Sequence, residues 1–184
     1  MKSPLDEISD PYKFQQVVAQ YFRRLKSERK DYFISDVCVE NNGVGGDDGC
    51  DILVEFHFED PIGRHCHKWV IECKSQANAV SPKDIPSSIE TILRSNKAKG
   101  YLLICKYDAT ASLKRHFKKN KENSNSEFDY VIWDGTQLWD YFSKHLTFIE
   151  QHFPKYYFEN YVKNKALENY ESFVNDFSQK LENK

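Results

Sequence analysis

Two short apolar runs constrain the fold of this chain more than any other feature. The first covers residues 49–55 and the second residues 69–76. Both are rich in β-branched and aromatic residues and are bounded by turn residues, which favours β-strands over helices. Yet Asp51 opens the first run, and Glu72 and Lys74 close the second. Charge at the end of an apolar hairpin conflicts with local burial, so we expect a functional site there.

Length and composition indicate a globular chain. Its 184 residues suffice for one domain with a substantial core, and the 40% hydrophobic content argues against disorder throughout. A formal net charge of −2 argues against a histone-like wrapping protein, although a local basic face could still bind phosphates. No run approaches the ~18 apolar residues of a membrane span, and residues 1–7 lack an apolar signal core. We therefore expect a cytoplasmic protein without a membrane partner.

The five cysteines are odd in number and form no CxxC pair. We therefore expect most of them to be reduced apolar residues. The cluster His65-Cys66-His67 raises the alternative of a zinc site. Adjacent strand residues point to opposite faces, however, and no second ligand pair lies at a familiar spacing. Zinc binding by these three residues is therefore disfavoured.

The remaining pattern alternates helices with strands. Helices are expected from Asp10-Pro11, from Ser81-Pro82, over residues 109–119 and after a cap at Thr136, and strands over residues 32–40, 50–58, 65–74, 101–105 and 128–133. By the strand period of two, Glu72 and Lys74 share one face.

The character of the chain changes after Pro154. A narrow apolar stripe there consists of Tyr170, Phe173, Val174, Phe177 and Leu181. We expect residues 1–153 to form one domain and residues 154–184 a C-terminal helical extension or connector. This helix would dock on the domain, on another copy of the chain, or lead into a further domain.

Two groups of polar residues outside the strands have open interpretations. In the first helix Gln15 lies at the edge of the apolar face, so it is either a solvated flank residue or a group that looks into a site beside the core. The helix over residues 109–119 carries Lys114, Arg115, Lys118 and Lys119. That run is either a solvated face or a phosphate-binding surface.

The trio Asp51, Glu72 and Lys74 suits phosphodiester hydrolysis. That reaction needs a nucleophilic water, charge neutralisation on the phosphate and a stabilised leaving oxygen, which carboxylate-bound divalent cations supply. A lysine beside the carboxylates can orient or deprotonate the water, or offset charge on the phosphate. The alternative is a salt bridge at a strand end. The three residues alone leave both interpretations open.

Five stretches, in this order, resemble the PD-(D/E)xK nuclease superfamily and its Mrr-like restriction-endonuclease branch. They are Phe14-Gln15, Gly46-Asp47-Asp48-Gly49-Cys50-Asp51, Glu72-Cys73-Lys74, residues 100–104 and residues 131–138. The likeness extends over roughly residues 10–145. It implies an α/β, restriction-endonuclease-like three-layer fold with a central mixed β-sheet flanked by helices.

The resemblance also implies roles for individual residues. Asp51 and Glu72 would bind the metal, together with the backbone carbonyl of Cys73, and Lys74 would be the catalytic lysine. Gln15 stands where this branch often has a glutamate, so it could bond a metal-bound water without adding charge. The implied cofactor is Mg²⁺, with Mn²⁺ as a substitute. The implied partner is DNA, with Lys106 and the basic helix as candidates for backbone contacts.

We therefore expect a Mg²⁺-dependent DNA endonuclease of the restriction or anti-phage defence type. Cutting both strands would favour a homodimer, and the chain could be the N-terminal effector domain of a larger protein. One alternative is a catalytically inactive nuclease-like module that binds nucleic acid or a partner, which the uncharged Gln15 favours. Another is a junction- or RNA-cleaving enzyme on the same fold.

Overall fold

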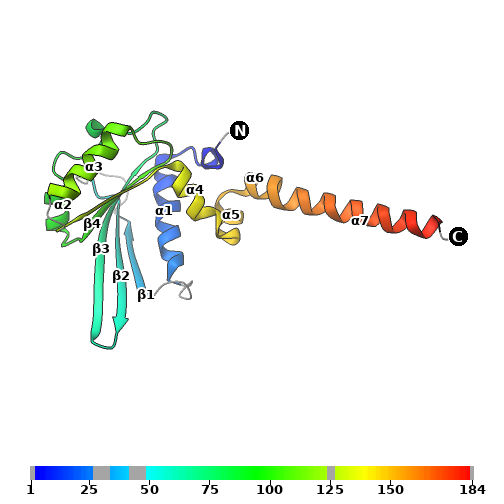
Figure 1. The fold of residues 1–184 in the computed structure, drawn as a ribbon, viewed down its shortest axis with the longest axis horizontal. Coiled ribbons are helices and arrows are strands. Elements are labelled where there is room, and N and C mark those ends of the chain that lie inside the picture. The colour runs from blue at the N-terminus through cyan, green and yellow to red at the C-terminus, as the bar shows by residue number, and fades with distance from the viewer. Residues whose placement is uncertain (1–2, 27–33, 42–48, 124–126, 183–184) are drawn as a thin grey trace. The chain divides into compact units, whose positions relative to one another are not determined.

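A five-stranded mixed sheet forms the centre of the unit that spans Ile8–Tyr141 (Figure 1). The computed structural model describes residues 3–26, 34–41, 49–123 and 127–182, and only the backbone of residues 173–182. The strands follow the order β1 (Ile34–Asn41), β2 (Ile52–Asp60), β3 (Gly63–Lys74), β4 (Gly100–Cys105) and β5 (Asp129–Trp133). The first three strands pair antiparallel, whereas β4 and β5 run parallel to β3. The expected central mixed sheet is therefore confirmed.

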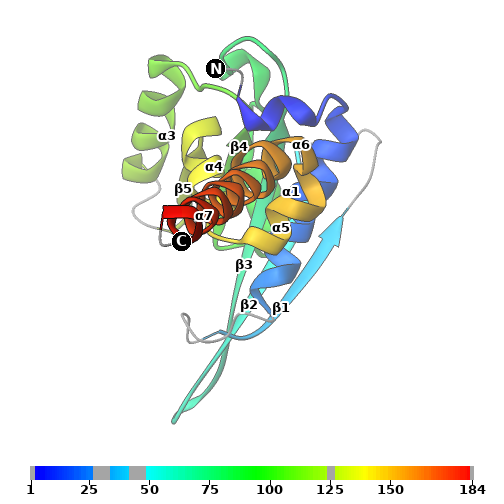
Figure 2. The same cartoon turned by 90° about the vertical axis from the view of Figure 1, so that its right-hand side faces the viewer.

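Helix α1 (Pro11–Leu25) packs on one face of the sheet (Figure 2). Its first turn is capped as expected, because the Asp10 carboxylate accepts hydrogen bonds from the backbone N–H groups of Tyr12 and Lys13. Near its C-terminal end, Phe22 stacks on Trp133 of β5, with ring centroids 5.7 Å apart. The apolar side of α1 and the alternate residues of the strands thus form one half of the core.

Helices α2 (Ile89–Ser95) and α3 (Ala111–Asn123) cover the opposite face (Figures 1 and 2). The buried cluster between these helices and the sheet includes Leu53, Val70, Leu93, Leu103, Leu113 and Phe117. Strand β4 is buried along its whole length. Helices therefore flank the sheet on both faces, which agrees with the expected three-layer arrangement.

Two helix starts differ from the expectation. The stretch from Ser81 forms only a 3-10 turn (η2, Pro82–Asp84), and α2 begins at Ile89. Pro86 disfavours helical backbone at the preceding residue, and Ile85 is extended, with φ −118° and ψ 159°. Helix α4 (Gly135–Ser143) is capped by Asp134, whose carboxylate accepts from the Gln137 N–H, and not by Thr136.

The chain divides into two compact units, which we describe separately. One spans Ile8–Tyr141 and contains the whole sheet, and the other combines Met1–Glu7 with Phe142–Lys184. The second unit contains η1 (Pro4–Glu7), α5 (Leu146–His152), α6 (Pro154–Tyr157), a π-helical turn η3 (Phe158–Val162) and α7 (Lys163–Glu182). The expected boundary between residues 153 and 154 stays a prediction.

Within this second unit, aromatic packing and one carboxylate organise the short helices. The Phe142 ring packs on Phe148 and Phe153, with centroids 4.9 and 6.0 Å away. The Glu7 carboxylate accepts from the backbone N–H groups of Lys155 and Tyr156 at the start of α6. Every helix in the described part of the chain is too short or too polar to span a bilayer.

The structure describes the side chain of only one residue in the apolar stripe expected for the C-terminal helix. Tyr170 is 66% exposed. Phe173, Val174, Phe177 and Leu181 lie among the residues whose side chains the structure does not describe.

Gly49 supports the start of β2 in a way that only glycine allows. Its φ is +87°, and a Cβ atom at this position would lie 2.1 Å from Cγ of Pro86. We predict that Gly49→Ala lowers the free energy of unfolding by about 1–3 kcal/mol, because it adds both backbone strain and a collision. Urea denaturation measures the change. Gly63→Ala is the matched control, since nothing lies within 4 Å of its Cβ position, and an equal loss there would contradict the local explanation.

Candidate active site

Asp51 is held against strand β3 by its backbone and its side chain. Its N–H donates to the Ile71 carbonyl at 3.0 Å, so the pairing of the two strands extends one residue before β2 begins. Its carboxylate Oδ2 accepts a hydrogen bond of 2.6 Å from the N–H of Cys73. Both bonds come from the same edge of β3, and they place Asp51 beside the end of that strand.

Glu72 and Lys74 lie on one face of β3, as strand alternation requires. Lys74 Nζ is 2.6 Å from Oε1 of Glu72. The side chain of Glu72 is only 5% exposed, whereas that of Lys74 is 28% exposed. From the neighbouring strand β4, the hydroxyl of Tyr101 donates to Oε2 of Glu72. The carboxylate is therefore buried and bonded at both oxygens, and the ammonium reaches towards solvent.

The burial of Glu72 changes its titration. Desolvation raises the pKa of the Glu72 carboxyl, and the nearby charge of Asp51 acts in the same direction. The bonds from Lys74 and Tyr101 oppose this shift without cancelling it. Burial, followed by the charge of Glu72, also raises the pKa of Tyr101, so its hydroxyl keeps the proton that it donates.

A cleft of about 510 Å³ opens in front of this pair. Gly49, Glu72 and Lys74 line one side, and residues of the segment 83–92 line the other. The cleft lies at the carboxyl end of β3, the end at which open α/β sheets bind ligands. A phosphate group could enter there and meet the Lys74 ammonium.

The donor atoms at this site fit a hard divalent cation. Asp51 and Glu72 offer carboxylate oxygens whose mutual repulsion a cation would relieve. The N–H of Cys73 points to Asp51, and the carbonyl of the same residue leaves the strand on the same edge. The Cys73 thiol belongs to the opposite face, with Ile71. Such an oxygen-only set suits Mg²⁺ or Mn²⁺ rather than zinc.

Gln15 is buried, and its side chain bonds to the backbone of Asp51. It is 6% exposed, and its Nε2 donates to the Asp51 carbonyl at 2.8 Å. The solvated-flank interpretation is therefore wrong. The amide supports the position of Asp51, and this hydrogen bond directs it at the main chain rather than at the cleft.

Lys106 does not occupy the position expected of a DNA contact. It is only 5% exposed, and its Nζ donates to the carbonyl of Ile8 at 2.6 Å. Its ammonium also lies 5.0 Å from the centroid of the Tyr107 ring. We correct the expectation: a buried, bonded ammonium cannot reach a phosphate, and Lys106 instead secures the segment before α1. Its place directly after the fully buried β4 was the available sequence signal.

The other expected DNA contacts lie on the exposed side of α3. Arg115 and Lys119 are exposed, and Lys118 is also exposed, with a weak pair to Glu122 at 4.0 Å. Lys114 is bound to Asp134 at 2.9 Å, at the carboxyl end of β5. Helix α3 covers the sheet face on which Glu72 lies, so its exposed cations and the cleft belong to one side of the molecule.

Comparison with known proteins identifies the family. Residues 5–142 match the family model Mrr_cat, described as restriction endonuclease. The chain belongs to this restriction endonuclease family. A comparison with curated proteins found no match.

Two solved structures are similar to this member of the family. The MspJI restriction endonuclease in complex with a 27-mer oligonucleotide has a TM-score of 0.49 at 10% identity, over 81% of this chain and 30% of that one. The DNA modification-dependent restriction endonuclease AspBHI has a TM-score of 0.38 at 12% identity, over 74% and 36%. The chain spans about a third of the length of each.

Tyr101 is the site residue that sequence reasoning missed in this restriction endonuclease domain. It lies opposite Val70 in the parallel pairing of β3 with β4, which puts its side chain on the face of Glu72. The available signal was a single hydroxyl in the otherwise apolar run from Tyr101 to Cys105.

We predict that Glu72→Gln raises the free energy of unfolding at neutral pH. A carboxyl whose pKa is raised by folding binds its proton more tightly in the folded state, so its ionisation lowers stability as pH increases. The gain of the variant is complete above the raised pKa and disappears below the ordinary carboxyl range. Urea titrations from pH 3.5 to 8 measure it. Glu59→Gln, at a largely exposed position, is the control, and a pH-independent difference for Glu72→Gln would contradict the explanation.

Proposed function

We propose that this chain is a Mg²⁺-dependent DNA endonuclease in which Mn²⁺ can replace Mg²⁺. The observation that carries the proposal is the bonding of Asp51 to the Cys73 N–H, beside the buried Glu72–Lys74 pair at an open cleft. Membership of the restriction endonuclease family supports phosphodiester hydrolysis as the reaction. A salt bridge between Glu72 and Lys74 does not account for the partly buried Asp51 carboxylate held next to them.

Each residue has a distinct task in this proposal. Asp51, Glu72 and the Cys73 carbonyl would hold the cation, which when bound would offset charge on the phosphate and lower the pKa of the attacking water. Lys74 orients that water or neutralises charge on the phosphate from its position at the cleft. Tyr101 fixes the rotamer of Glu72, and Gln15 positions the Asp51 backbone.

Helix α3 supplies the proposed contacts to the DNA backbone. Arg115, Lys118 and Lys119 extend from its exposed side, and Lys114 lies near the carboxyl ends of the parallel strands. A chain with a net charge of −2 would bind DNA modestly through so small a surface. We therefore further propose a homodimer or an additional domain, joined through residues 154–184, in a restriction or anti-phage defence protein.

The exposure of the C-terminal helix supports the proposal of a homodimer or an additional domain. Residues 161–172 are all exposed, including Leu167 at 51%. A helix that buries none of these side chains depends on other contacts for most of its stability. A partner for the helix would supply them.

We predict that Lys74→Ala and Asp51→Ala each reduce Mg²⁺-dependent plasmid nicking by at least about a hundredfold, as loss of a charge-stabilising group does in other active sites. Chelation of the metal should abolish nicking in the unmodified protein. Lys99→Ala is the matched control, because Lys99 precedes β4 at the opposite end of the parallel strands. Nicking that persists in the Asp51 and Lys74 variants would contradict the assignment.

We predict that Lys118→Ala with Lys119→Ala weakens DNA binding similarly for all sequences. Each lost phosphate contact should reduce the slope of log K against log[salt] by about 0.9. Fluorescence anisotropy at several salt concentrations, in an Asp51→Ala background, measures this slope. Lys13→Ala serves as the control, because Lys13 is exposed on α1, over the other face of the sheet. An unchanged slope in the double variant would exclude α3 as the binding surface.

One observation favours a second function, DNA binding without cleavage. Gln15 adds no charge and bonds only to the backbone among the contacts described here, and both oxygens of Glu72 already have protein partners. Calorimetry with Mg²⁺ and Mn²⁺ separates the two functions. DNA binding without measurable metal binding would support the second. Parallel assays on duplex, junction and RNA substrates decide which nucleic acid is cut.

A further inference from the structure

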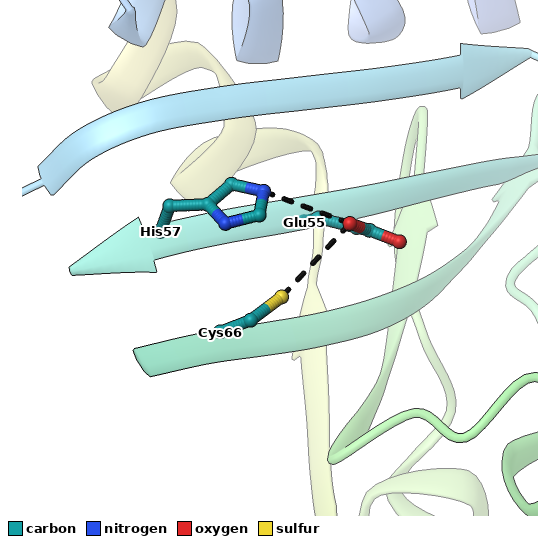
Figure 3. A group of neighbouring side chains, drawn as sticks. All are labelled: Glu55, His57 and Cys66. Atoms are coloured by element: carbon teal, nitrogen blue, oxygen red, sulfur yellow. Dashed lines mark hydrogen bonds and ion pairs between the residues drawn. The ribbon is translucent and has the colours of Figure 1, made fainter. Parts of the chain in front are cut away.

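Three potential metal ligands converge on the hairpin formed by β2 and β3, away from the nuclease site. They are Glu55 and His57 of β2 and Cys66 of β3 (Figure 3). One ligand atom from each side chain lies within 4.8 Å of the other two. The Glu55 carboxylate is the centre of the group, with Oε2 3.6 Å from His57 Nε2 and 3.9 Å from Cys66 Sγ.

The register of the hairpin explains why these residues meet. His57 pairs directly with Cys66, and Glu55 precedes His57 by two residues on the same face. His65 and His67 pair with Phe58 and Phe56 and therefore point to the other face. His65 and His67 therefore lie on the face opposite Cys66, as expected for neighbours in a strand. The residues that share the face of Cys66 are His57 and Glu55 of the paired strand.

The ligand types and spacings fit zinc. Zn²⁺ binds thiolate sulfur at about 2.3 Å and imidazole nitrogen or carboxylate oxygen at about 2.0–2.2 Å, so tetrahedral ligands lie about 3.4–3.6 Å apart. Two of the three separations, 3.6 and 3.9 Å, are close to these values, and the third is within 4.8 Å, so side-chain movements would bring the ligands together. Cys66 is exposed, which gives a cation access from solvent.

Neighbouring charges orient the group for a cation. The second oxygen of Glu55, Oε1, pairs with Lys68, which leaves Oε2 directed at His57 and Cys66. Such bonds to the distal atoms of metal ligands commonly hold them in place.

The cluster is separate from the nuclease site in position and in chemistry. Cys66 and Glu72 are six residue steps apart along β3, which corresponds to about 20 Å of extended chain. The pairing of β3 with β4 starts only at Trp69, so Cys66 belongs to the outer part of the hairpin. The nuclease site offers only oxygen donors, whereas this group adds sulfur and nitrogen.

We propose that Glu55, His57 and Cys66 form a Zn²⁺ site that fastens the outer part of the β2–β3 hairpin. Three protein ligands leave a fourth position for water or for a group on a partner. The cation links the two strands where β4 no longer supports them. This proposal does not depend on nuclease activity, since none of its residues belongs to the cleft.

The test uses the full chain with Co²⁺ alone as a spectroscopic substitute for Zn²⁺. We expect one thiolate-bound Co²⁺ per chain, seen as a thiolate-to-cobalt charge-transfer band in the near ultraviolet, and loss of this band when Zn²⁺ displaces the cobalt. Cys66→Ser should abolish the band, and His57→Ala should weaken binding by at least about tenfold, as loss of metal-site contacts does elsewhere. Far-UV circular dichroism verifies that both variants are folded.

Matched variants on β1 and on the opposite face of the hairpin make the assignment specific. Cys38→Ser removes another exposed thiol, and His67→Ala removes an imidazole from the opposite face of the hairpin. Both should retain the band and the affinity. The proposal is overturned if the unmodified chain shows no charge-transfer band, if Cys66→Ser retains the band, or if Cys38→Ser is the variant that loses it. Cobalt held only at Asp51 and Glu72 would produce no such band.

Discussion

The hydrogen bond from the Cys73 N–H to the Asp51 carboxylate is the contact on which the candidate nuclease site depends. Strand β2 begins only at Ile52, so no β2 ladder continues alongside Cys73. The Asp51 side chain takes the place of the missing strand. An acidic residue is thereby held at a strand edge, beside the ion pair of Glu72 with Lys74.

The remaining contacts around Asp51 maintain this position at some expense to stability. Gly49 adopts a left-handed conformation against Pro86, Gln15 is buried to bond the Asp51 backbone, and the Glu72 carboxyl is desolvated, which raises its pKa. Each of these features is unfavourable or restrictive in isolation. Several such unfavourable features close to Asp51 are typical of a functional site, where residues are retained for activity although they lower stability.

Much of the fold was predictable because it follows from local patterns. The strand runs, the Asp10 cap and the shared face of Glu72 and Lys74 depend on periodicity over a few residues, and all agree with the structure. The delayed start of α2 was also within reach of sequence reasoning, since Pro86 was visible. The capping signal at Ser81 starts only the 3-10 turn, and Pro86 keeps the chain extended before α2.

Residue chemistry and strand periodicity determined, from the sequence alone, that Asp51, Glu72 and Lys74 form a candidate site. Only the tertiary structure decided which distant residues join it. Tyr101 reaches Glu72 through the register of β3 with β4, Lys106 is buried against Ile8, and Cys66 meets His57 across the hairpin. These contacts depend on strand pairing and chain packing, and a shift of one residue in register would reverse every face. Local periodicity does not specify that register.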